Sequence, residues 1–95
     1  MNQVSPDKLP PQNLEAEKSI LGALILDKEA IHKIADIVSP EDFYQYGHQL
    51  IAQAAFTLYE KHEPIDLLSL SNKLSEMNAL ENIGGLAYLT SLVNS

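Results

Sequence analysis

Apolar residues gather in the stretch LPPQNLEAEKSILGALIL, residues 9–26, and their spacing changes along it. Two prolines at its start disfavour a helix, and Asn13 then offers a side-chain oxygen that can cap a helix N-terminus. In the predicted helix 13–26, the second half is apolar almost all round, with Gly22 as a point where another backbone can approach closely. The pattern predicts a buried central helix, whose inward residues are expected to be Ile20, Leu21, Leu24, Ile25 and Leu26.

Apolar residues at helical spacing predict four further main helices, which cover residues 28–38, 48–61, 67–77 and 86–93. Asp27 and Asp66 precede the first and third of these helices, and each is expected to act as an N-cap. No segment alternates between apolar and polar residues for long enough to indicate a strand. The sequence therefore predicts an all-α fold of five main helices plus a short one.

Proline, asparagine and glycine mark the breaks between these helices. Ser39-Pro40-Glu41-Asp42 combines a cap, a proline at the first helical position and acids behind it, which predicts a short turn that inserts Phe43 into the core. Asn78 suits a left-handed helix end, and Gly84-Gly85 permits a sharp turn. On the last helix, the residues expected to face inward are Leu86, Leu89 and Val93.

Length and charge limit the kinds of protein this chain can be. With 95 residues there is enough for one domain, which we place at residues 13–95 behind a flexible tail at residues 1–12. The net charge is −7 and the sequence contains no Arg, so direct binding to a nucleic-acid backbone is not expected, whereas a basic partner is. The chain has no cysteine, no signal sequence and no apolar run of membrane-spanning length, from which we expect a cytoplasmic protein.

The sequence contains no recognisable catalytic, cofactor or metal site. The pair Gly84-Gly85 is followed by Leu and Ala, not by the Lys and Ser/Thr of a phosphate-binding loop. The three histidines, His32, His48 and His62, have no two members at a spacing that would place them together on one helical face, so metal binding is not expected. No serine has the surroundings of a nucleophile elbow.

Two small sets of residues remain as candidate contact sites. Tyr44 and Tyr46 have no basic neighbours, so core packing is the favoured interpretation over stacking on a nucleic-acid base. Glu15 and Glu17 lie in the first turn of the opening helix, where the helix dipole favours anions, and Tyr88 lies near the start of the final helix. Glu15, Glu17 and Tyr88 are therefore the candidate protein-contact residues, with an exposed acidic rim expected at the two glutamates.

Four segments in order give the chain a recognisable likeness. PPQNLEAEKSILGALIL, SPEDFY with His48 behind it, EPIDLLSLSNKL and IGGLAYL resemble the N-terminal domain of the DnaB-type replicative DNA helicases, from about Leu9 to Val93. The resemblance implies a compact orthogonal bundle of helices that forms a globular head. In the family this head is followed by a helical hairpin, a linker and a RecA-like ATPase domain, none of which is contained in these 95 residues.

The same resemblance implies a function for the parent protein and for this part of it. The parent would be a homohexamer that unwinds duplex DNA at the replication fork with ATP and Mg²⁺, bound by the ATPase domain. The head would take part in a collar and dock the helicase-binding domain of primase and a helicase loader. Because the hairpin is the family's main pairing element, we expect this piece alone to be a monomer or a weak head-to-head dimer.

Three other interpretations compete with this one. The helicase-binding domain of primase resembles the same fold, but in primase it lies at the C-terminal end, whereas here the LPPQN segment lies near the start. A free-standing helical DNA-binding regulator would bind duplex DNA at low salt, which the absence of Arg disfavours. An unrecognised small enzyme would reveal itself by a melting temperature that a ligand raises.

Overall fold

Caps and breaks along the chain determine where the helices begin and end. In the computed structural model, which describes residues 13–94, Asn13 caps α1 (Leu14–Leu26) by accepting a hydrogen bond from the Ala16 N–H at 3.0 Å. Asp66 caps α4 (Leu67–Glu76) in the same way through the Ser69 N–H at 2.8 Å. The caps predicted at Asn13 and Asp66 are therefore confirmed.

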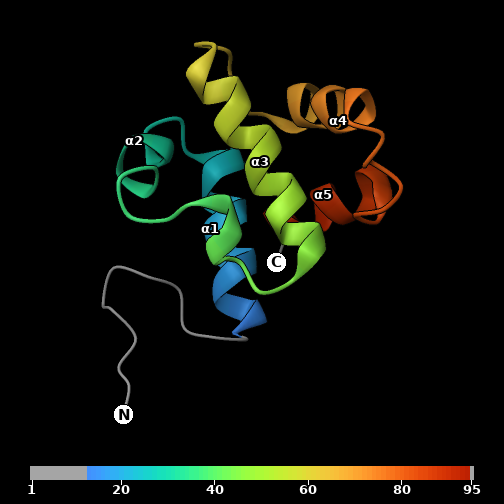
Figure 1. The fold of residues 1–95 in the computed structure, drawn as a ribbon, viewed down its shortest axis with the longest axis horizontal. Coiled ribbons are helices and arrows are strands. Elements are labelled where there is room, and N and C mark those ends of the chain that lie inside the picture. Colours follow the sequence, from blue (N-terminus) through green and yellow to red (C-terminus); the bar gives the residue numbers. More distant parts are fainter. Residues whose placement is uncertain (1–12, 95) are drawn as a thin grey trace.

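The remaining elements are α2 (Ala30–Ile34), the short 3₁₀ helix η1 (Pro40–Asp42), α3 (Tyr46–Glu60) and α5 (Gly85–Asn94). No strand occurs between residues 13 and 94, and the five α-helices with one short helix match the all-α prediction. α3 runs through the middle of the molecule and packs against α1, α4 and η1, while α5 closes the bundle against α1 and α4 (Figure 1). α2 packs on α1 at the outer side.

The core lies between α3 and the helices around it. η1 carries the predicted capping box between Ser39 and Asp42, and the next residue, Phe43, is 1% exposed, as predicted. Large apolar side chains from four helices are almost fully buried around it: Leu21, Leu24, Ile51, Leu70, Leu74 and Leu89.

At Gly22 the helices α1 and α5 approach each other closely. A Cβ atom at this position would lie 2.6 Å from the carbonyl oxygen of Leu92, closer than side chains approach a backbone. Glycine therefore allows the two helices to pack at this separation, as the sequence indicated. At the other predicted special positions, Asn78 has φ 58° and Gly84 and Gly85 have φ 107° and 72°, so the expected left-handed turns are present.

The second predicted helix is wrong in its extent. α2 covers only Ala30–Ile34, not residues 28–38. After Ile34 the chain continues in hydrogen-bonded turns, in which the N–H groups of Ile37 and Val38 both donate to the carbonyl oxygen of Ile34. The backbone then becomes extended at Ser39, with φ −114° and ψ 163°, because the following proline disfavours helical conformation there. Asp27 does not cap this helix either; its carboxylate accepts from the N–H of Glu29, two residues on.

Two leucines predicted to face inward are exposed. Leu26 is 68% exposed because it lies two residues after the buried Leu24, about 200° round the helix from it. Leu86 is 51% exposed because the buried face of α5 is centred between Leu89 and Leu92, about 90° round the helix from Leu86. In both cases the prediction of a helix is right and only the inward placement of this one leucine is wrong.

Candidate functional site

The first turns of three helices meet around one buried carboxylate, that of Glu17. Glu17 lies on α1, His48 lies near the start of α3 and Tyr88 lies near the start of α5. Oε1 of Glu17 is 2.7 Å from Nδ1 of His48, and Nε2 of His48 is 2.6 Å from the hydroxyl of Tyr88. Glu17 and His48 are both 0% exposed, and we call these three residues the buried network.

The Glu17 carboxylate also binds the backbone in front of α3. Its Oε2 accepts from the N–H of Tyr44 at 2.5 Å, and its Oε1 lies 3.4 Å from the N–H of Gln45. These amides belong to the residues just before α3, where the helix dipole favours a negative charge. The buried carboxylate is therefore satisfied by hydrogen-bond donors from two parts of the chain, and no buried side-chain N or O atom among the described residues lacks a partner.

The hydrogen bonds determine how the protons are arranged. An ionised carboxylate only accepts, so we assign the Nδ1 proton of His48 to the bond with Glu17. Nε2 of a neutral imidazole is then an acceptor for the Tyr88 hydroxyl. Burial raises the pKa of Tyr88, and the negative charges of Glu17 and Glu15 raise it further, so this hydroxyl keeps its proton and donates it.

The structure corrects one of the three candidate contact residues. Glu17 was expected on an exposed acidic rim, but its side chain is fully buried, because it satisfies donors from α3 and from the segment before it. Glu15 is on the surface, with 88% of its side chain exposed and Lys18 at 3.7 Å. Tyr88 is half-buried. Glu15 and Tyr88 therefore remain as candidate contact residues.

Tyr44 and Tyr46 are not in the core, contrary to the prediction. Tyr44 is 61% exposed and Tyr46 is 66% exposed. The backbone is extended at Phe43 and at Gln45, and successive side chains of an extended segment point to opposite sides. Because Phe43 points into the core, Tyr44 points outward. The sequence offered one signal of the exposure of Tyr44: it directly follows Phe43, which was predicted to point into the core.

The other histidines lie outside the buried network. His32 is exposed, and its Nδ1 is 3.3 Å from the hydroxyl of Tyr59. His62 is exposed and has φ 60°. Across residues 13–94, no three His, Cys, Asp or Glu side chains are grouped so that they would hold a metal ion. No helix in that range is both long and apolar enough to cross a membrane.

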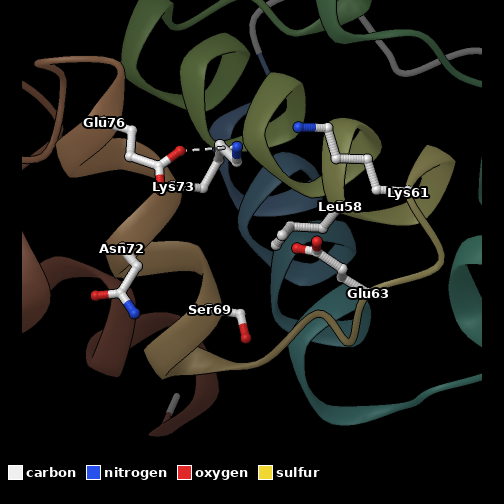
Figure 2. Close-up of a pocket in the computed structure, with 7 residues that line it drawn as sticks. All are labelled: Leu58, Lys61, Glu63, Ser69, Asn72, Lys73 and Glu76. Carbon is white, nitrogen blue, oxygen red and sulfur yellow. Dashed lines mark hydrogen bonds and ion pairs between the residues drawn. The ribbon is translucent and has the colours of Figure 1, made fainter.

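The surface also has a polar hollow of about 320 Å³ between the end of α3 and α4 (Figure 2). Lys73 donates a hydrogen bond to Glu76 at 2.9 Å across its edge, and this bond is the main cause that raises the pKa of Lys73 and lowers that of Glu76. Two lysines and two glutamates balance each other, so the hollow has no strong preference for anions or cations. Its lining residues are Leu58, Lys61, Glu63, Ser69, Asn72, Lys73 and Glu76.

Comparison with known proteins gives consistent matches. The family model for the DnaB-like helicase N terminal domain matches residues 9–95. The replicative DNA helicase DnaC of Bacillus subtilis (strain 168) is 40% identical over 95 residues, which are 100% of this chain and 21% of that protein. The replicative DNA helicase DnaB of Geobacillus stearothermophilus is 38% identical over 95 residues, with the same coverage.

A solved structure agrees with the fold. The crystal structure of the N-terminal domain of DnaB helicase from Mycobacterium tuberculosis matches with a TM-score of 0.86 and 38% identity, covering 90% of this chain and 60% of that one. The helical bundle expected from the resemblance is therefore confirmed. The chain spans about a fifth of the length of the curated relatives, at 21% of each of the two named above.

Proposed function

This chain belongs to the family of DnaB-like helicase N-terminal domains, and on that premise we propose that it is the head domain of a replicative DNA helicase. The parent protein would unwind duplex DNA at the replication fork with ATP. The head would assemble into the collar of a homohexamer and dock primase, a helicase loader and other replisome proteins. The observation that carries this proposal is the family match over residues 9–95, supported by the structural likeness at a TM-score of 0.86.

The sequence bears on where the parent protein would bind ATP. It has no phosphate-binding loop, so the ATP and Mg²⁺ of the proposed activity would be bound by other residues of the parent. The two relatives named above are about five times longer than this chain, which leaves room for such residues.

The surface around the buried network supports a basic protein partner. Glu15 is exposed, Tyr88 is half-buried beside it in the electrostatic field of two carboxylates, and the whole chain has a net charge of −7. Opposite charge accelerates encounter and selects partners, so a basic surface on primase would be favoured here. Glu15 and Tyr88 are the residues that we propose to contact it.

The experiment is a titration of this chain with the helicase-binding domain of the cognate primase, followed by calorimetry and by NMR. We expect saturable binding with shifts at Glu15 and Tyr88. Glu15→Lys should weaken the affinity about three- to tenfold, since it reverses an exposed charge at the contact. Glu60→Lys, which reverses an exposed charge at the far end of α3, is the matched control and should bind like the wild type.

Absence of binding at high concentrations of both proteins would contradict the docking role of this chain. Family membership would stand in that case, because it rests on the sequence match. Binding that Glu15→Lys and Glu60→Lys weaken equally would show a general charge effect and would remove Glu15 from the contact.

A further inference from the structure

Two tyrosine rings stand exposed beside the buried network. Tyr44 is 61% exposed and Tyr46 is 66% exposed, on a chain of 95 residues that contains four tyrosines. We propose that Tyr44 and Tyr46 receive a cationic side chain, Lys or Arg, from the protein partner that docks on this head. This inference rests on the proposed docking function and adds the residues and the chemistry of the partner.

The backbone that carries the rings is held in place by hydrogen bonds and by a side chain buried in the core. The N–H groups of Tyr44 and Gln45 are directed at the Glu17 carboxylate, and Phe43 anchors the segment in the core. The side-chain amide of Gln49 donates to the carbonyl oxygen of Phe43 at 2.7 Å and secures it further. A surface that is already ordered loses less conformational entropy when it binds, which favours its use as a docking site.

The two rings lie two residues apart at the entry to α3. The backbone is extended at Phe43 and at Gln45, bends between them, and becomes helical at Tyr46. Phe43 points into the core, and Tyr44 and Tyr46 point away from it, consistent with their exposure. Exposed aromatic side chains with a polar tip are typical of protein contact surfaces.

The charges near the rings favour a cation over an anion. Glu17 places a buried carboxylate directly under the backbone of Tyr44, and among the described residues this carboxylate is hydrogen-bonded to His48 and forms no ion pair with a lysine. Glu41 is exposed three residues before Tyr44, and the field of Glu15 reaches as far as Tyr88. A cation over an aromatic face is attracted by the ring, and these carboxylates add to that attraction, whereas a nucleic-acid phosphate would be repelled.

The test distinguishes the contribution of the aromatic rings to binding from that of exposed apolar surface. Tyr44→Leu and Tyr46→Leu keep an apolar side chain and remove the ring, and each should weaken binding of the primase helicase-binding domain about three- to tenfold. Tyr44→Phe and Tyr46→Phe keep the ring and should bind within about twofold of the wild type. Leu68→Ala, at a residue on α4 that is 70% exposed, is the control for loss of exposed apolar area and should bind unchanged.

The outcomes distinguish this inference from the proposed function. Leu variants that bind like the wild type overturn the inference and leave the docking role intact. Phe variants that lose as much affinity as the Leu variants also overturn it, since the hydroxyl and not the ring would then carry the contact. Failure of the wild type to bind primase removes both proposals together.

Self-association must be measured in the same samples. Sedimentation velocity should give the same oligomeric state for the wild type and for all four tyrosine variants, and their melting temperatures should agree because the rings are exposed. A change of oligomeric state in the Leu variants would assign the rings to an interface between copies of this chain and would overturn the inference.

Discussion

Glu17 carries a charge in a place where charges are costly. Transfer of a carboxylate from water to a protein interior is strongly unfavourable unless hydrogen bonds and a partner charge or dipole compensate for it. Here the compensation comes from the Nδ1 proton of His48, from the N–H of Tyr44 and from the start of α3. Removal of the acceptor would leave these buried donors without a partner, which is the larger part of the cost of such a change.

Glu17→Gln should therefore lower the free energy of unfolding by about 2–4 kcal/mol, because the amide NH₂ offers a donor where the site needs an acceptor. Urea denaturation followed by circular dichroism measures this change. Glu15→Gln, two residues earlier on the same helix and 88% exposed, is the matched control and should leave the midpoint unchanged. Equal midpoints for both variants would contradict the structural role of the buried network.

Local features of the sequence predicted most single-residue roles that depend on near neighbours. Asn13 and Asp66 act on N–H groups three residues away, and Phe43 follows a turn that the sequence itself defines. The role of Glu17 was missed because its partners lie 27 and 31 residues further along the chain. An acid in the first turn of a helix is explained locally by the helix dipole. The sequence does not show when such an acid is instead held by hydrogen bonds to residues far along the chain.

At the scale of helices, features that depend on neighbouring residues were again predicted, and features that depend on distant parts of the chain were not. Helical spacing gave the number and order of the helices and, except for the extent of α2, their approximate bounds, since that signal is local. The spacing did not give the buried face of α1 at Leu26 or of α5 at Leu86, because this depends on which neighbour covers it. Gly22 is the exception, where the residue type alone indicated a close contact between helices.

Gly22→Ala should destabilise the protein, although alanine is the better helix former by about 1 kcal/mol. The added methyl group would meet the Leu92 carbonyl at 2.6 Å and push α1 and α5 apart, which we expect to cost about 1–3 kcal/mol. Thermal denaturation measures the result. Gly47→Ala on α3 is the control: its Cβ would lie 3.1 Å from the flexible end of Gln45 and at ordinary contact distances of 3.7 and 3.8 Å from Ile83, so the melting temperature should hold or rise. A rise for Gly22→Ala as well would mean that the helices separate without cost.

At the scale of the whole molecule, charge decides which partners are accessible. A net charge of −7 without any Arg opposes contact with a phosphate backbone. We therefore expect no change in the fluorescence anisotropy of a labelled DNA duplex in 50 mM salt, at protein concentrations up to about 100 μM, where non-specific binders are already engaged. A basic DNA-binding domain of similar size serves as the positive control. A saturable rise with this chain would support the DNA-binding regulator interpretation instead.

The buried network also affects when the domain can fold during its synthesis. Its members are residues 17, 48 and 88, so Tyr88 leaves the ribosome well after Glu17 and His48. Until then, His48 has no hydroxyl to bind, and α1 has no α5 to cover it. Translation adds roughly 5–20 residues per second, so the first helices lack their packing partner α5 for several seconds. We expect the domain to fold only after its final helix has emerged, and not helix by helix during synthesis.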